Sequence, residues 1–187
     1  EEREGASFLI SNMPPIDLVE MDRETFLEHI RYAYKVRAEF PWVKNLSDDK
    51  FLHYVLPYRM SQEPIERWRK FFYDSLAYLM KDLKTQSEVA LKVNEWCGKR
   101  IKFKPTARRD QGPFETLKSG YGRCEEMMIF YIAAARSVGI ACRQTWTPYW
   151  PKMDNNHAWV EVWDGQNWAF LGACEPAPAL NVAWFKN

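Results

Sequence analysis

Two residues of this sequence have the side chains and local surroundings that nucleophilic catalysis on an amide requires. Cys124 directly follows the glycine-rich segment 107–123 and stands at the first turn of an apolar helix that we predict over residues 124–138. Backbone N–H groups and the helix dipole favour the thiolate form at such a position. His157 opens a predicted strand, and an imidazole beside that thiol would form the ion pair of a cysteine nucleophile. The alternative is that Cys124 belongs to the core and His157 only begins a strand, and single-residue patterns alone favour that alternative.

One helix and three strands would position these two side chains. The helix predicted over 124–138 has little polar surface, so we expect it to be central and covered on most sides. Gly139 stands where a left-handed C-cap is expected. Strands are predicted at 142–146, 157–163 and 168–171, with a turn at 164–167. Alternation in the second strand would place small apolar residues on one face and His157 on the other.

The sequence of residues 1–100 predicts a helical region. Apolar spacing indicates helices over residues 22–39, from Pro64 to about Leu83, and from Ser87 to about Cys97. Thr25 and Glu28 could form a capping box in the first of these. Because helices precede antiparallel strands, we predict an α+β fold. A helical N-terminal region, 1–100, would pack as one unit with a core at 101–187 that we expect to be truncated at its C-terminus.

The composition excludes several classes of protein. The chain has 187 residues, 47% hydrophobic and 27% charged, which is typical of a soluble globular protein. Its net charge of +1 provides no overall attraction for nucleic acid or anionic lipid. No apolar run is long enough to insert into a membrane, and the start of the chain is not a signal peptide. We expect a monomer.

The four cysteines do not form a metal-binding pattern. None of them stands in a CxxC pair, which argues against a zinc ribbon or a thioredoxin-like site. We expect no metal and no organic cofactor. Cys97, Cys142 and Cys174 are interpreted as small buried apolar residues.

Two segments resemble the transglutaminase-like superfamily. YGRCEEMMIFYIAAARSVGIACR, residues 121–143, resembles its nucleophile segment, which reads G-x-C before a small-residue helix that ends in R-x-x-G-I-x-x-R. NHAWVEVWDGQNW, residues 156–168, resembles its histidine strand and the following turn. The motifs are most similar to those of peptide:N-glycanases and of bacterial secreted domains. The resemblance covers about residues 116–176 and implies a papain-like fold, in which the cysteine helix packs on the antiparallel sheet that carries the histidine.

The resemblance also implies roles for individual residues. Cys124 would be the nucleophile, and His157 its general base and later its acid, in acyl transfer from an amide through a thioester. The third catalytic residue of the superfamily is usually an Asp on the strand after the histidine strand, and Gly172 stands at that position here. The nearest acid is Glu175, for which we predict the orienting role. Glu175 could instead contact substrate.

Strand register argues against Glu175 as the orienting acid. If Trp163 pairs with Trp168, Cys174 lies opposite His157 and Glu175 belongs to the other face. Only a bulge, or an end of the strand near Pro176, would turn Glu175 towards the histidine.

We expect a cysteine hydrolase that cleaves an amide bond of a peptide or glycopeptide. Hydrolysis is favoured over cross-linking because the sequence identifies no amine-binding tunnel. The backbone N–H of Cys124 is the expected oxyanion donor, and Gln111 and Trp146 are weak side-chain candidates. Four aromatic residues near the motifs are candidates for substrate binding, although they could equally be core: Trp146, Tyr149, Trp150 and Trp159.

Two other functions remain open at this stage. One is a catalytically inactive peptide- or glycan-binding module of a larger surface protein. The other is an N-glycanase-like amidase, although this chain lacks the CxxC zinc pairs of eukaryotic N-glycanases. Resemblance to bacterial secreted domains indicates a secreted or cell-surface location.

Overall fold

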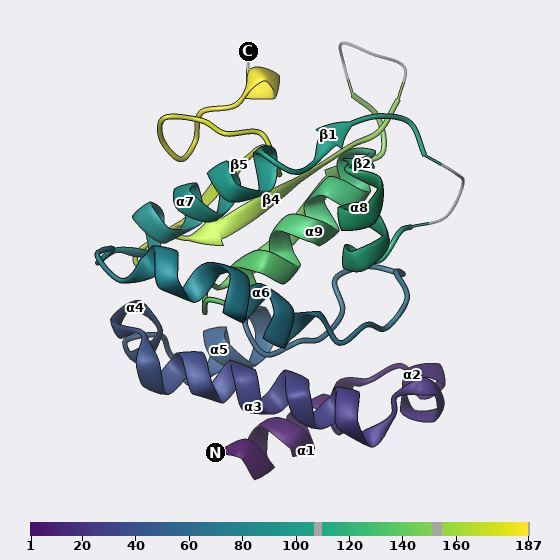
Figure 1. The fold of residues 1–187 in the computed structure, drawn as a ribbon, viewed down its shortest axis with the longest axis vertical. Coiled ribbons are helices and arrows are strands. Elements are labelled where there is room, and N and C mark those ends of the chain that lie inside the picture. The colour runs from purple at the N-terminus through teal and green to yellow at the C-terminus, as the bar shows by residue number, and fades with distance from the viewer. Residues whose placement is uncertain (107–109, 151–154, 187) are drawn as a thin grey trace.

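Helices fill the first half of the chain in the computed structural model, which describes residues 1–106, 110–150 and 155–186 (Figure 1). Two further helices follow the first strand, and α6 continues into a 3-10 turn at Ala77–Met80. The α-helices of the described residues are α1 (Glu2–Asn12), α2 (Pro15–Glu20), α3 (Arg23–Glu39), α4 (Pro41–Lys44), α5 (Asp48–Tyr54), α6 (Trp68–Leu76), α7 (Gln86–Gly98), α8 (Pro113–Ser119) and α9 (Cys124–Arg136).

The strands confirm the α+β prediction. Strands β3 (Cys142–Thr147), β4 (His157–Trp163) and β5 (Trp168–Leu171) form an antiparallel sheet in the order β3-β4-β5. Trp163 pairs with Trp168, the pairing that the register argument assumed. Two short strands, β1 (Lys102–Phe103) and β2 (Tyr121–Gly122), form a separate parallel pair that the sequence analysis missed.

Helix α9 lies at the centre of the molecule. Every residue from Glu126 to Arg136 is buried, because α6, α7 and α8 pack on the helix and the sheet covers another side (Figure 1). The side chains of Ala158, Val160 and Val162 make the buried face of β4. Gly139 ends the turn after α9 with φ 81°, the left-handed conformation that its position predicted. The sheet and the cysteine-bearing helix are therefore held together by one core.

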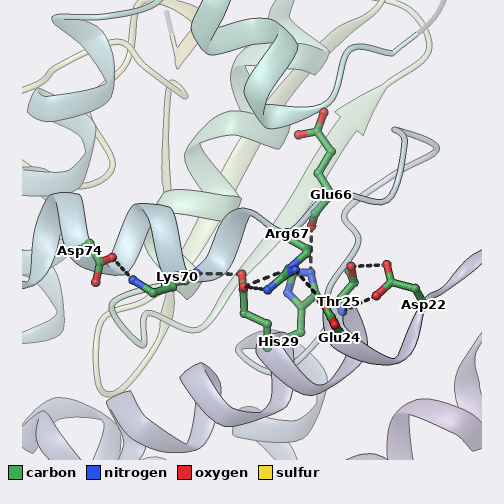
Figure 2. Close-up of polar contacts among 9 residues, drawn as sticks. Asp22, Glu24, Thr25, His29, Glu66, Arg67, Lys70 and Asp74 are labelled. Atoms are coloured by element: carbon green, nitrogen blue, oxygen red, sulfur yellow. Dashed lines mark hydrogen bonds and ion pairs between the residues drawn. The ribbon is translucent and has the colours of Figure 1, made fainter.

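Several helix ends differ from their predicted positions because other side chains provide the caps. Asp22 caps α3, accepting the backbone N–H of Thr25 at 2.9 Å, so the predicted Thr25–Glu28 capping box is wrong. Figure 2 shows this cap beside Arg67, which reaches from the start of α6 to Glu24 at 3.1 Å. Arg67 also binds Glu28 at 3.0 Å, which removes that carboxylate from the α3 cap.

Two other predicted ends shift, and some short elements were missed. Helix α6 begins at Trp68 and not at Pro64, and Thr85, not Ser87, caps α7 in a capping box with Glu88. Helices α1 and α2 were not predicted, and the predicted loop 107–123 contains α8 and β2. Residues 107–109 of that loop lie outside the described residues.

Two buried arginines tie the loop after α5 to the rest of the core. Arg69 of α6 is fully buried and donates to the carbonyl oxygens of Val55, Leu56 and Pro57 at 2.9–3.1 Å. Burial lowers the pKa of Arg69 to about 9. Arg136 of α9 donates to three carbonyl oxygens of the same stretch, those of Tyr54, Pro57 and Arg59, each at 3.1 Å.

The helical region and the sheet share one hydrophobic core. Phe72 of α6 and Trp96 of α7 pack on Phe130 of α9, with ring centroids 5.2 and 6.1 Å away. The division at residue 100 into two regions stays a prediction. Within the part of the chain that the structure covers, no helix is both long and apolar enough to cross a membrane.

Candidate functional site

A cavity of about 450 Å³ brings together the three residues predicted to be catalytic. Cys124 enters it from the start of α9, His157 from the start of β4, and Glu175 from the turn after β5. The other residues around it are mostly apolar or amide side chains. The lining consists of Phe103, Pro105, Arg123, Cys124, Glu125, Met127, Asn155, Asn156, His157, Ala158, Ala173, Glu175 and Trp184.

The start of α9 is fixed by an ion pair and a close backbone approach. Glu126 accepts the backbone N–H of Arg123 at 2.7 Å and also binds its guanidinium group. A Cβ at Gly122 would lie 2.8 Å from the Glu126 Cβ, so only glycine fits there without a shift. This packing leaves Cys124 half-buried at the helix N-terminus, as predicted.

Burial dominates the electrostatics of Cys124. It raises the pKa of the thiol, while the backbone N–H groups of Ala158 and Glu125 act weakly in the opposite direction. The thiol form is therefore favoured in this arrangement, although the helix N-terminus was expected to favour the thiolate. The other cysteines, Cys97, Cys142 and Cys174, are buried free thiols, as the sequence predicted.

His157 lies in an aromatic enclosure. It is only 8% exposed, and its ring lies 5.0 Å from the rings of both Trp184 and Phe185. Trp150 and Trp159 add ring contacts at 5.4 and 5.9 Å. Burial lowers the pKa of the imidazole, and its Nε2 atom has no hydrogen-bond partner among the described residues. His157 thus faces the same cavity as Cys124, with an unpaired Nε2 atom and a pKa shift that favours the neutral imidazole.

Glu175 folds back over Gly172, the position at which the resemblance led us to expect an Asp. Strand β5 ends at Leu171, and the backbone N–H of Glu175 donates to the carbonyl of Gly172 at 3.2 Å, closing a turn. Cys174, inside this turn, has φ 58°. A Cβ built on Gly172 would overlap with Glu175 Oε2. The carboxylate therefore occupies the space that a side chain at 172 would take, and the register argument fails because the strand has already ended.

The part of the chain that the structure describes shows no hydrogen bond between Glu175 and His157, although one was predicted. Glu175 Oε2 instead accepts the indole N–H of Trp184 at 2.9 Å. Burial raises the pKa of the Glu175 carboxyl, and the bond from Trp184 only partly opposes that rise. The two side chains share the cavity without contact between acid and imidazole, so an orienting role for Glu175 stays a prediction.

The predicted aromatic residues divide into two groups. Trp150 and Trp159 contact the ring of His157, whereas Trp146 and Tyr149 are 60% and 61% exposed. None of the four lines the cavity. Gln111, a candidate oxyanion donor, is also outside the lining.

The sequence analysis missed three residues that contact the site. Trp184 and Phe185 lie in a short 3-10 helix, Trp184–Lys186, which returns to the sheet after a long irregular segment that carries no periodic signal. Asn94 is buried in α7, and its amide donates to the carbonyl oxygens of Gly172 and Glu175. Among the described residues, no group of three or more His, Cys, Asp or Glu side chains could hold a metal ion.

Comparisons with known proteins found a matching family model and similar folds. A family model described as the transglutaminase-like superfamily matches residues 74–173. A solved structure described as a candidate cysteine protease from Cytophaga hutchinsonii is similar over 76% of this chain, with a TM-score of 0.57 and 22% identity. This chain spans about half of that protein, 48% of its length.

A second solved structure is LapG from Legionella pneumophila, treated with EGTA. The similarity covers 81% of this chain and 77% of the LapG chain, with a TM-score of 0.46 and 16% identity. No curated protein matches this chain.

Proposed function

Because the chain belongs to the transglutaminase-like superfamily, we propose that it is a cysteine-dependent amide hydrolase. His157 takes the proton of the Cys124 thiol, and the sulfur attacks the amide carbon. The C–N bond breaks as His157 gives its proton to the leaving nitrogen, which leaves a thioester on Cys124. Water then attacks the thioester, and the acid product and the free thiol are released.

One observation carries this proposal: Cys124, His157 and Glu175 line a single cavity although they come from three separate elements. Cys124 stands at the N-terminus of a buried helix, where free backbone N–H groups can also stabilise an oxyanion. A cysteine that serves only to fill the core is not expected to face a cavity that also contains an imidazole with an unpaired nitrogen.

Activity requires the site to become charged. In the arrangement described, burial raises the pKa of Cys124 and Glu175 and lowers that of His157, and each shift favours the uncharged form. We propose that Glu175 leaves Trp184 and accepts a hydrogen bond from His157 in the active arrangement. The carboxylate would stabilise the imidazolium, which in turn would stabilise the thiolate.

The cavity supports a peptide or glycopeptide as substrate. Phe103, Met127 and Trp184 provide apolar and aromatic surface, and Asn155 and Asn156 provide amide groups that can hydrogen-bond peptide or sugar. Hydrolysis remains the proposed outcome, because an open cavity admits the water that resolves the thioester.

Thiol alkylation tests the proposal without a known substrate. Folded protein is treated with iodoacetamide at neutral pH, and the modified cysteines are identified by peptide mass spectrometry. We expect Cys124 to react first and His157→Ala to slow this reaction, while buried Cys97, Cys142 and Cys174 react slowly. Labelling of Cys124 no faster than that of the buried thiols, or unchanged by His157→Ala, would contradict the proposal.

The unpaired His157 Nε2 and the uncharged site favour a second candidate, a non-catalytic peptide-binding module. The two candidates differ in turnover. An enzyme releases cleaved product from a peptide or glycopeptide library and loses this activity in Cys124→Ala. A binding module retains the same peptides uncleaved, with or without the thiol.

A further inference from the structure

We propose that Asn94 is a positioning residue that holds Glu175 in the catalytic site. This inference rests on the proposed function, because Glu175 has a role to be positioned for only if the site is catalytic. It assigns part of the catalytic arrangement to α7, a helix of the N-terminal region.

Asn94 fixes both ends of the turn that carries Glu175. Its side chain is fully buried, and Nδ2 donates to the carbonyl oxygen of Gly172 at 3.0 Å and to that of Glu175 at 2.9 Å. The backbone N–H of Glu175 closes the same turn on Gly172. Both N–H donors of one amide are thus used on the two residues whose separation defines the turn.

The turn needs an external restraint because it contains an unfavourable backbone conformation. Cys174 has φ 58°, which a residue with a Cβ adopts at a cost in free energy. Its thiol contacts the carbonyl of Met127 at 3.3 Å, so the core holds one side of the turn and Asn94 holds the other. Without Asn94, only the Cys174 side of the turn would still be held against an extended continuation of β5.

The direction of the Glu175 side chain depends on this turn. With the turn formed, the carboxylate lies over Gly172 and faces the cavity. In an extended strand, residue 175 would lie about 10 Å along the chain from residue 172, so its carboxylate could not lie over Gly172. Asn94 therefore decides whether the acid is held against Gly172 or moves away along the strand.

Gln86 offers a matched control on the same helix. It is buried like Asn94, donates from Nε2 to the carbonyl of Trp42 at 3.1 Å, and does not line the cavity. The carbonyl oxygens of both amides, Asn94 Oδ1 and Gln86 Oε1, have no partner among the described residues. Replacing either residue with leucine removes a buried amide that donates to the backbone, but only Asn94→Leu releases the turn that carries Glu175.

The experiment measures how alkylation of Cys124 by iodoacetamide depends on pH. The variants are Asn94→Leu, Glu175→Gln, the double variant and Gln86→Leu, with folding checked by thermal unfolding. We expect Asn94→Leu and Glu175→Gln each to raise the pH midpoint of Cys124 alkylation, because the imidazolium loses its carboxylate. Below the midpoint, the rate falls about tenfold for each pH unit by which the midpoint rises.

The double variant should have the midpoint of Glu175→Gln, because Asn94 acts only through Glu175. Gln86→Leu should keep the wild-type midpoint even if its thermal stability falls. If Asn94→Leu does not fold, Asn94→Ser replaces it. Serine keeps one donor for two carbonyl groups, so its midpoint should still lie above the wild-type value.

The outcomes separate this inference from the proposed function. A wild-type midpoint in the Asn94 variants, or shifts that add in the double variant, overturns the positioning role while the cysteine chemistry stands. An unchanged midpoint in Glu175→Gln also overturns it, because Glu175 would have no effect to transmit. Among the results of this experiment, slow labelling of Cys124 in the wild-type protein is the one that counts against the proposed function itself.

Discussion

Gly172 has no side chain, and Glu175 fills the space where one would lie. A methyl group added by Gly172→Ala would overlap with Glu175 Oε2 and lie 3.1 Å from the Glu175 Cβ. The backbone of Gly172 is outside the left-handed region, so alanine itself is tolerated there. We expect Gly172→Ala to destabilise the wild-type protein but to have almost no effect when Glu175 is first replaced by alanine.

The magnitude follows from the contacts that must change. To make room, the carboxylate turns away and loses the N–H of Trp184, which costs about 1 kcal/mol. The tight Cβ–Cβ contact adds about 1 kcal/mol of overpacking. Replacing glycine lowers the entropy of the unfolded chain and returns about 0.4–1 kcal/mol. The net loss is about 1 kcal/mol in the wild-type protein, and it falls to near zero in Glu175→Ala, where no carboxylate must move.

Urea unfolding of the wild type, both single variants and the double variant measures this coupling. The predicted coupling is about 1 kcal/mol, above the roughly 0.3–0.5 kcal/mol within which independent substitutions add. If the free energy of unfolding depends equally steeply on urea concentration in all four proteins, they expose the same surface on unfolding and their free energies can be compared. Additive free energies would refute the placement of the Glu175 carboxylate over Gly172.

Three other predictions concern Trp184, Phe130 and His29. Trp184→Phe removes the N–H that holds Glu175, so Cys124 should be alkylated faster at pH 7, and equal or slower labelling than in Trp163→Phe, a tryptophan outside the cavity, would contradict this. Phe130→Ala should lower the free energy of unfolding by about 3–5 kcal/mol in urea, because the ring is fully buried between Phe72 and Trp96. Burial lowers the pKa of His29 to about 3, so the unfolded state binds an extra proton below pH 6.5. Stability should therefore be complete above pH 6.5 and fall towards pH 3 by at most about 1.4 kcal/mol per pH unit from this residue, and His29→Gln should show a shallower fall in urea titrations.

Strong periodicity made the central elements predictable. The helix that begins at Cys124 and the three strands of the sheet were located from sequence to within a few residues, and the pairing of Trp163 with Trp168 followed from the short turn between them. The caps were less predictable, because Asp22 and Thr85 compete with nearby residues of equal propensity. Only tertiary contacts, such as that between Arg67 and Glu28, decide between them.

The surroundings of the site could not be predicted, because they depend on contacts between distant parts of the chain. Asn94 and Glu175 are separated by 81 residues in sequence, and Trp184 approaches the cavity through an irregular segment without periodicity. The sequence indicated which residue types could act at Cys124 and His157. It did not indicate that Glu175 would fold back over Gly172, because strand alternation does not apply beyond the end of β5.

The two buried arginines have a consequence for how the molecule unfolds. Arg69 and Arg136 come from helices on opposite sides of residue 100, and both bind the carbonyl groups of residues 54–59. Separating the chain there would take the carbonyl groups of Tyr54, Pro57 and Arg59 from the Arg136 guanidinium group, and the carbonyl group of Arg136 from Arg69, in an apolar interior. The helical region and the sheet are therefore expected to melt in a single cooperative transition, so hydrogen exchange in α3, α9 and β4 should report one common opening free energy.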